Sequence, residues 1–413
     1  MEKHQRVSIL STIVLVGFAL SAGYHYVQGA YLGRGYPYDT FLCNPAGRGS
    51  DFSDVLRDGH TLQPYLQYSS AQYPLMALIG FLLYPLGSLA YPTFLLFVLA
   101  AFTFFSAASV QVAKATSTAL PVFAIAFLSY PFLFAVDRGN FELLVFVLLL
   151  GFMYFFTRGR YSWSAICLGL AIALKLYPVI LLAVYFPAGK TRSALLAVAV
   201  AATATLGSLM CFKGGLAANA SFLLQGDNFR SNALFREFTS FSSPMVQRGV
   251  TLLTFIKWFS IETGFIRGMG DTLFLSRYLA ASALIGVVAV VYAVFVEQDL
   301  WKRVAVLVLV MLLLPPLSAD YKLLLLYVPL YLFVESDKPS RLDPAYLAVF
   351  GLLLVPKSYY YLSSVFSESG AAHDISIAVP LNVLLLIALS LLIGIPGLVN
   401  RFRRAPGSPI PLK

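Results

Sequence analysis

The chain has 413 residues, of which 59% are hydrophobic and only 12% are charged, and its mean hydropathy is +0.79. A soluble protein carries about twice that share of charged residues, so the composition excludes a soluble globular enzyme and indicates a polytopic helical membrane protein. The formal net charge of +10 does not indicate a nucleic-acid partner, because Lys and Arg are scattered over helix ends and loops without forming a basic stripe. We assign the excess to membrane topology and to contact with anionic membrane lipids.

Apolar segments recur along the whole sequence, and they predict a single all-α integral membrane domain that covers residues 1–413. Each segment approaches or reaches the length that spans a bilayer, which gives about eleven to thirteen transmembrane helices. One more apolar run, 74–90, is broken by Pro85 and Gly87, so it either spans the bilayer or lies in its interface. The remaining apolar segments are 7–27, 91–112, 119–136, 141–157, 162–186, 193–212, 273–296, 303–317, 321–334, 344–356 and 377–399.

The positions of Lys and Arg near the helix ends predict the orientation of the chain. Lys3 and Arg6 place the N-terminus in the cytoplasm, and "RFRR" at 401–404 places the C-terminus there too. We therefore expect a multi-pass protein of the inner (plasma) membrane. Four regions would lie on the outer side: 28–90, 213–272, the short 317–322 and 357–376.

The orientation of the segments between 91 and 186 has two solutions. If 74–90 spans the bilayer, "DRGN" at 137–140 faces the cytoplasm; if 74–90 lies in the interface, "DRGN" faces outward. The second solution requires 162–186 to break near "KLYP" at 175–178, where a proline is present. We favour it because it places the arginines of "TRGR" at 157–160 in the cytoplasm.

The first outer region contains "GRGSDFSDVLRDGH", an acidic stretch in an otherwise apolar chain. Ser50 suits the N-cap of a short helix, on which Asp51, Asp54 and Asp58 fall at i, i+3 and i+7 on one face. Crowded carboxylates raise one another's pKa, which suits a general base. We take Asp51 as the base and Asp54 as the second candidate; the alternative is a solvated acid that complements the helix dipole.

Charged residues inside or beside apolar segments are costly and indicate function. Lys175 lies in "LGLAIALKLYPVILL", with at least six non-ionisable residues on either side. Arg138 precedes a helix that begins near Glu142, and Lys322 lies between two apolar segments, where the alternative is a side chain that extends to the interface. A phosphate is the natural ligand for such cations. The predicted phosphate ligands are Arg138, Lys175, Lys322 and, from the second outer region, Arg248.

Aromatic and amide side chains near these charges suggest a pocket for a sugar ring or a lipid head group. Tyrosines alternate with prolines in the first outer region, where the alternative is an interfacial aromatic belt. The predicted pocket residues are Tyr65, Tyr73, Asn140, Asp320 and Tyr321.

An acid in an outer loop and cations at outer helix ends together suit glycosyl transfer from a polyprenyl-phosphate sugar. The aspartate would accept the proton of an acceptor hydroxyl, the oxygen would attack the anomeric carbon, and polyprenyl phosphate would leave. The leaving phosphate needs electrostatic stabilisation more than a proton, and Arg or Lys provides it.

The order of these motifs resembles that of the GT-C glycosyltransferases and, within them, glycosyltransferase family 87, the polyprenol-phosphate-mannose-dependent mannosyltransferases. The resemblance covers about residues 1–335 in order and spacing, and the ordered series is more specific than any single motif. The motifs that carry it are "SDF" with Asp51, then Tyr65, "YPL" with Tyr73 and Pro74, "RGN" at 138–140, "GLAIALKLYP" with Lys175 and Pro178, and "PPLSADYK".

The resemblance implies a GT-C-type bundle with juxtamembrane helices in the 28–90 region, Asp51 as the catalytic base, and a pocket at the outer leaflet. It also implies an inverting enzyme that transfers one sugar, with mannose the first choice, to a glycolipid or glycan acceptor. The 213–272 region would lie on the acceptor side. Three departures affect the donor site: "YPL" replaces Tyr-Pro-Pro, Arg138 replaces Gln, and Tyr321 and Lys322 replace two histidines.

Two other functions remain open at this stage. A polysaccharide polymerase of the O-antigen type would also have many spans and a large outer loop, and would take an oligosaccharide on pyrophosphate. A lipid-linked sugar transporter would have interrupted helices, but the sequence shows no matching halves. We expect a monomer that needs no cofactor, since no His or Cys cluster has ligand spacing; Asp51, Asp54 and Asp137 could bind a divalent metal weakly.

Overall fold

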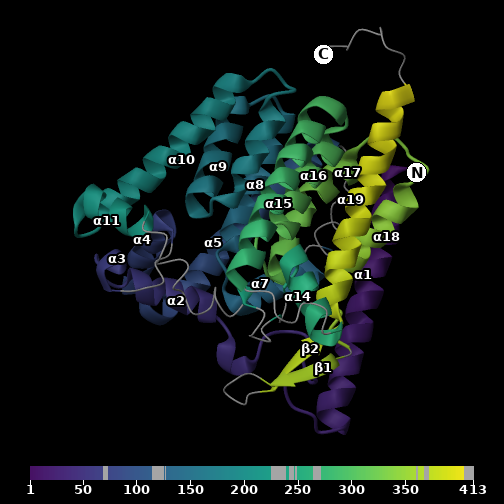
Figure 1. Cartoon of the computed structure of the whole chain (residues 1–413), viewed down its shortest axis with the longest axis horizontal. Coiled ribbons are helices and arrows are strands. Elements are labelled where there is room, and N and C mark those ends of the chain that lie inside the picture. The colour runs from purple at the N-terminus through teal and green to yellow at the C-terminus, as the bar shows by residue number, and fades with distance from the viewer. Residues whose placement is uncertain are drawn as a thin grey trace.

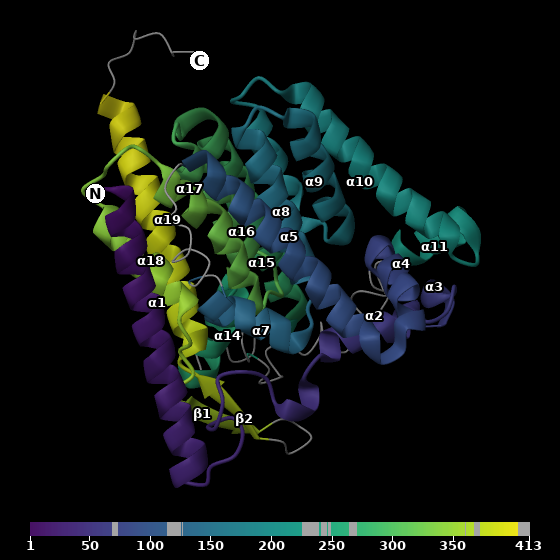
Figure 2. The same ribbon diagram turned by 180° about the vertical axis from the view of Figure 1, so that it is seen from behind.

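The structure is a computed structural model, and it describes residues 1–67, 73–113, 125, 127–224, 239–240, 246, 249–263, 271–359, 361–366 and 372–403. Helices dominate the described chain and pack side by side into one bundle (Figures 1 and 2). The start of α1 and the end of α19 lie at one end of this bundle, and the helices of the first loop lie toward the other end. The protein is therefore an all-α polytopic membrane protein, as its composition predicts.

The first long helix, α1 (Lys3–Tyr26), continues as a π-helical turn, η1 (Val27–Tyr31), and leads into the 28–90 region. This region contains the expected short helices, and α2 and α4 pack against each other. Gly49 with φ +65° occupies the N-cap of α2, so Ser50 is already helical and the prediction of Ser50 as N-cap was wrong. The short elements are η2 (Pro45–Gly47), α2 (Ser50–Gly59), α3 (Pro64–Gln67), α4 (Pro74–Leu83) and η3 (Tyr84–Leu89).

The helices that follow run back and forth between the two ends of the bundle (Figure 2). Their bounds are α5 (Ala90–Ala113), α7 (Tyr130–Arg138), α8 (Glu142–Thr157), α9 (Tyr161–Leu174), η4 (Tyr177–Tyr185), α10 (Thr191–Cys211) and α11 (Gly215–Leu224). The apolar segment 162–186 breaks as the favoured topology requires: α9 ends at Leu174, Lys175 is extended, and Pro178 lies in the first turn of η4. The turn 137–140 lies against the first loop, because the Gly49 N–H donates to the Asp137 carbonyl at 2.8 Å.

In the second half of the chain, α15 and α16 lie in front of α8 in the view of Figure 1, and α18 and α19 lie beside α1. The helices of this half are α14 (Leu252–Thr263), α15 (Asp271–Val291), η5 (Tyr292–Val296), α16 (Leu300–Leu313), η6 (Asp320–Leu326), α17 (Tyr327–Glu335), α18 (Asp343–Leu354) and α19 (Ala378–Arg403). An antiparallel hairpin, β1 (Tyr361–Phe366) and β2 (Ala372–Ser376), joins α18 to α19. The sequence did not predict this hairpin.

Five described helical stretches are long and apolar enough to cross a membrane. One of them, Thr272–Val296, has only 6% of its most apolar window buried, so its apolar side chains face outward, where lipid covers them in a membrane. The total of eleven to thirteen spans remains a prediction, because it also counts shorter apolar helices such as α8 and α18. The five stretches are Lys3–Tyr31, Pro74–Phe105, Thr191–Cys211, Thr272–Val296 and Ala378–Val399; the second contains Gly87, whose φ of 54° and ψ of −124° are not helical.

Candidate functional site

The Asp51 carboxylate, in the first turn of α2, lies against the turn between α7 and α8. Arg138 Nη2 forms an ion pair with Asp51 Oδ1, and the Asn140 amide donates to Asp51 Oδ2 at 2.5 Å. The side chains of Asp51 and Arg138 are 19% and 29% exposed, so a substrate can reach both. Arg138 and Asn140, which lie 87 and 89 positions after Asp51 in the chain, thus contact the same carboxylate.

Asp137 fastens the first loop to this turn. Its carboxylate accepts the backbone N–H of Cys43 at 2.8 Å and pairs with Arg48 at 3.2 Å. Gly139 allows the close approach, since its φ is +66° and a Cβ there would lie 2.7 Å from the Phe52 Cβ. The position of Asp51 therefore depends on backbone that lies some ninety residues later.

Asn140 and Glu142 extend the group toward Lys175. The Asn140 Oδ1 accepts from the Glu142 backbone N–H at 2.8 Å and from Lys175 Nζ at 3.1 Å. The Glu142 carboxylate, which is fully buried, accepts from Lys175 at 2.8 Å and from the Tyr177 hydroxyl. Because α9 breaks before the proline, Lys175 lies in extended backbone directly after α9, and Tyr177 is the first residue of η4.

The turn η6 brings Tyr321 and Lys322 to the same place. Lys322 Nζ lies 4.9 Å from the centre of the Tyr177 ring, and it is close enough to Glu142 and Lys175 to interact electrostatically with both. The Tyr321 side chain lies close enough to Asn140 and Asp51 to interact electrostatically with both. We call the eight residues the site network: Asp51, Arg138, Asn140, Glu142, Lys175, Tyr177, Tyr321 and Lys322.

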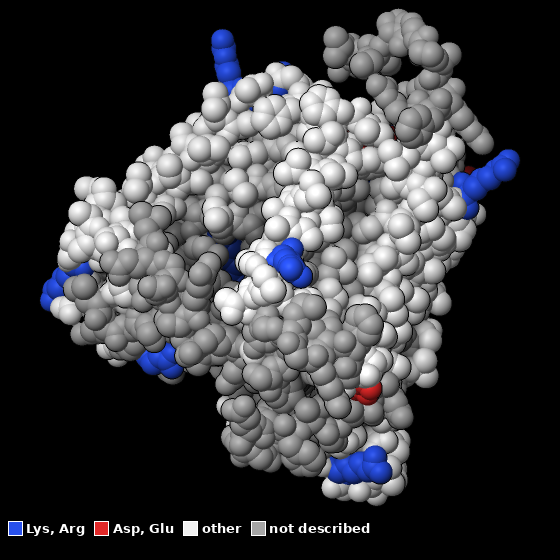
Figure 3. Space-filling view, viewed as in Figure 1, with Lys and Arg blue, Asp and Glu red and all other residues white. Residues whose placement is uncertain are grey.

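The charges of the site network are paired but not balanced. Burial by itself lowers the pKa of the Arg138 guanidinium, but the Asp51 carboxylate beside it raises that pKa above its ordinary value. Three cations and two carboxylates leave one positive charge in excess. On the face drawn in Figure 3, basic atoms lie inside a recess between α9 and α15, so part of the positive charge of the protein is set back from the surface.

The remaining predicted site residues lie elsewhere or make other contacts. Asp54 is half exposed and pairs with Arg57 at 3.0 Å, and the buried Asp58 lies 3.6 Å from the same guanidinium. Asp51 pairs with Arg138 instead. Tyr73 is 43% exposed at the N-cap of α4. Arg248 lies outside the described residues.

Two other predicted pocket residues are buried. Tyr65 packs against Phe212 and Phe222 in a small hydrophobic cluster, and these ring contacts explain its burial without a ligand. Asp320 is 2% exposed and accepts from the Tyr130 hydroxyl, which fastens η6 to α7 one residue before Tyr321. Among the described residues, the contacts of Tyr65 and Asp320 therefore stabilise the fold around the site network.

Sequence reasoning did not assign a role to Glu142 or Tyr177. Acids are common in the first turn of a helix, as Glu142 is, and tyrosines such as Tyr177 are common at the membrane interface. The available signal was the cost of a lysine inside an apolar segment, which requires a carboxylate partner nearby. Within the described residues no three or more His, Cys, Asp or Glu side chains come together in a way that could hold a metal ion.

The described helices form a membrane-embedded bundle, and a group of one partly exposed carboxylate and several cations lies at the ends of its helices. The model of glycosyltransferase family 87 matches residues 68–316, which is more than half of the chain, and the chain therefore belongs to glycosyltransferase family 87. Arg138, Asn140 and Lys175 lie inside the matched range, whereas Asp51 precedes it and Tyr321 follows it. Comparison with curated proteins and with solved structures gave no match.

Proposed function

We propose that this glycosyltransferase is an inverting enzyme that moves a single sugar, with mannose the first choice, from a polyprenyl-phosphate donor to a glycolipid or polysaccharide acceptor. The reaction takes place at the outer face of the plasma membrane, and both termini are cytoplasmic. The observation that supports this proposal is the site network, in which the partly exposed Asp51 carboxylate is connected through hydrogen bonds and ion pairs to two cations from other parts of the chain, Arg138 and Lys175.

Asp51 acts as the general base in this proposal. A carboxylate offers about four lone-pair positions, so Arg138 and Asn140 leave room for an acceptor hydroxyl. The hydroxyl proton passes to Asp51, the acceptor oxygen attacks the anomeric carbon, and the bond from that carbon to the phosphate oxygen breaks. Attack opposite the leaving group inverts the anomeric centre.

Lys175 and Lys322 stabilise the phosphate that leaves. Neither lysine has all of its donor capacity used by the described residues: Lys175 donates to Asn140 and Glu142, and Lys322 lies over the Tyr177 ring. An ammonium group meets a phosphate as a point charge and needs no proton transfer. The donor lipid thus places its phosphate at the broken end of α9, while its chain extends into the membrane.

The test is transfer by the purified protein from a radiolabelled polyprenyl-phosphate sugar to an extracted acceptor lipid. Asp51→Asn should lower the rate by about a hundredfold to ten-thousandfold, the range that a general base contributes. Asp54→Asn is the matched control, because it makes the same change on the same helix at a carboxylate that pairs only with Arg57 among the described residues. Wild-type transfer by folded Asp51→Asn protein would remove Asp51 from the mechanism.

The same assay separates the alternative functions. A polymerase would transfer an oligosaccharide from a pyrophosphate lipid and would not use the monophosphate donor. A transporter would move the lipid-linked sugar across vesicles without any acceptor and without forming a new glycosidic bond.

A further inference from the structure

Glu142 is the one member of the site network that is fully buried and negatively charged, and the proposed reaction gives it no step. A buried carboxylate is costly unless cations and hydrogen bonds compensate it. Lys175 and the Tyr177 hydroxyl provide that compensation directly, and Lys322 lies within electrostatic reach. One carboxylate thus faces two lysines.

The neighbouring charges do not alter this count among the described residues. Asp137 pairs with Arg48, and Asp320 lies near Lys357, so each of these acids has a basic partner. Asp51 and Arg138 form their own ion pair. The two lysines and Glu142 therefore determine the excess charge of the site, and it is one positive unit.

An excess of one positive charge matches the charge of the donor better than the charge of the polyprenyl phosphate that leaves. A polyprenyl-phosphate sugar is a phosphodiester with one negative charge, whereas the polyprenyl phosphate that leaves is a monoester with nearly two charges near neutral pH. Without Glu142 the excess would be two positive units, which would match the leaving monoester. We propose that Glu142 is a buried counter-ion that weakens the hold of the site on the leaving polyprenyl phosphate, and so sets the rate of product release.

This inference rests on the proposed function, because it assumes a polyprenyl-phosphate donor. Glu142 is a positioning residue here, and it acts on the phosphate through Lys175 and Lys322. Glu142→Gln tests the charge alone, since a glutamine oxygen can still accept from Lys175 while its amide nitrogen donates to the Tyr177 hydroxyl.

The experiment measures binding of polyprenyl phosphate, without sugar, to the purified full-length protein in lipid nanodiscs. Glu142→Gln should bind polyprenyl phosphate about tenfold more tightly than the wild type, because a negative charge that repels the bound phosphate has been removed. Steady-state transfer should slow, while the rate of a single turnover should stay within about threefold of the wild type. Glu142→Asp keeps the charge and should keep the wild-type affinity.

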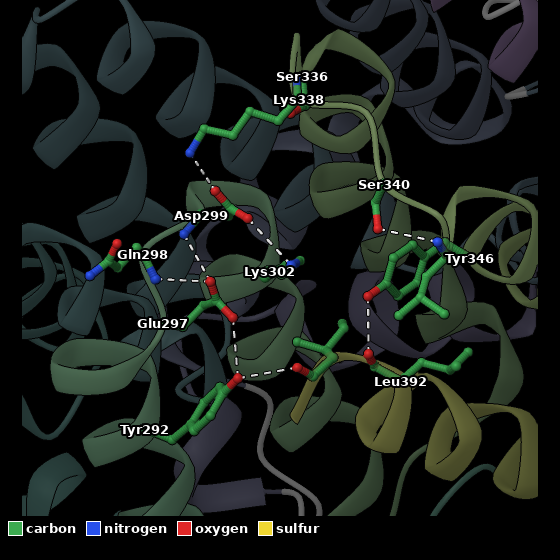
Figure 4. A network of polar contacts seen from close by, with 12 residues as sticks. Tyr292, Glu297, Gln298, Asp299, Lys302, Ser336, Lys338, Ser340, Tyr346 and Leu392 are labelled. Atoms are coloured by element: carbon green, nitrogen blue, oxygen red, sulfur yellow. Dashed lines mark hydrogen bonds and ion pairs between the residues drawn. The ribbon is translucent and has the colours of Figure 1, made fainter. Parts of the chain in front are cut away.

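Glu297→Gln is the matched control. Glu297 is also a buried carboxylate that accepts from a tyrosine hydroxyl, Tyr292 at 3.1 Å, but it belongs to a separate polar network (Figure 4). Its substitution should leave the affinity for polyprenyl phosphate unchanged. Equal or weaker binding by Glu142→Gln, or an equal gain in Glu297→Gln, would overturn the inference.

A double variant covers the case in which Glu142→Gln does not fold. Glu142→Gln with Lys175→Gln removes the buried pair together and keeps the excess at one positive charge. It should bind polyprenyl phosphate about tenfold more tightly than Lys175→Gln alone, and equal affinity of the two would overturn the inference. Failure of the wild type to bind polyprenyl phosphate at all would instead overturn the proposed function.

Discussion

Two polar networks occupy opposite parts of this bundle, and they use the same kinds of residue to different ends. The site network lies where the first loop meets the ends of α7, α8 and α9. The second, which we call the terminal network, lies beside the start of α1, and Figure 4 shows part of it. It consists of Arg6, Tyr292, Glu297, Asp299, Lys302, Lys338 and Asp343.

The two arginines show the difference most clearly. Arg6 is 1% exposed and donates five hydrogen bonds, to Asp343 and to three backbone carbonyls, so its capacity is used up. Arg138 is 29% exposed and donates only to Asp51 and to Cys43 Sγ among the described residues. An arginine with spare donors and access to solvent can bind a ligand, whereas a saturated arginine holds helices together.

Breaking the ion pair of the terminal network should have the largest effect on stability. Arg6→Met leaves the buried Asp343 carboxylate with the N-terminal ammonium at 3.6 Å as its one remaining cation among the described residues, and we expect a loss of about 3–5 kcal/mol in the free energy of unfolding. Thermal unfolding in detergent measures it. Transfer per folded molecule should stay at the wild-type level, and a selective loss of transfer would contradict the separation of the two networks.

Breaking the site network should lower the transfer rate more than the stability of the fold. Lys175→Gln should lower the transfer rate by about a hundredfold, as loss of one charge-stabilising donor does in other enzymes, with a smaller effect on thermal unfolding. Lys302→Gln is the control, because Lys302 pairs with Asp299 at 3.3 Å in the terminal network. Equal losses of transfer in both variants would show that the difference between the networks is not functional.

Gly139→Ala tests the turn that joins the first loop to the site network. The added Cβ would be strained at φ +66° and would approach Phe52 to 2.7 Å, so we expect a cost of about 1–3 kcal/mol in stability. Gly159→Ala provides a control at φ +70°, where the nearest atom lies 4.0 Å away. Unfolding temperatures of the two variants measure the difference, and equal shifts would mean that contact with Phe52 is unimportant.

The smallest effect is expected from Asp299 at acid pH. Burial by itself raises the pKa of Asp299, but Lys338 at 2.6 Å and Lys302 lower it below 3.8. A carboxyl with a lowered pKa stabilises the folded state above its unfolded pKa, and this stability is lost as the pH falls below 3.8 through the folded value. Asp299→Asn should remove less than about 1 kcal/mol at neutral pH, and less still below pH 3, because Lys338 is largely exposed. Thermal unfolding at the two pH values tests this, and a larger effect in acid would contradict the direction of the shift.

The sequence predicts most of the fold because bilayer-length apolar runs and their breaks are local properties. The proline after Lys175 predicted the end of α9, and the turn at 137–140 lies with the first loop as the favoured topology requires. The β1–β2 hairpin could not be predicted, since its pairing depends on contacts that no local period of polarity reveals.

The site was predictable only where a residue is costly in its own segment. Lys175 was found because an apolar segment makes a charge conspicuous, and its partner Glu142 was missed because the start of a helix is an ordinary place for an acid. Helical spacing placed Asp54 beside Asp51, but only the packing of α2 decides that Asp51 alone meets Arg138. Tyr65 was assigned to a pocket because tyrosines alternate with prolines in the first outer region, and nothing in the sequence reveals Phe212 as its neighbour.

The attachment of Cys43 and Gly49 to Asp137 also sets an order of events during biosynthesis. The ribosome releases the acidic loop almost ninety residues before the segment that fixes it, and the residues of η6 emerge much later still. In a nascent chain that stops before residue 137, Asp51 would have no defined position. In one that stops before residue 320, Asp51 would be in position but Lys322 would be missing. The protein therefore gains its complete site network only when most of its helices have been inserted.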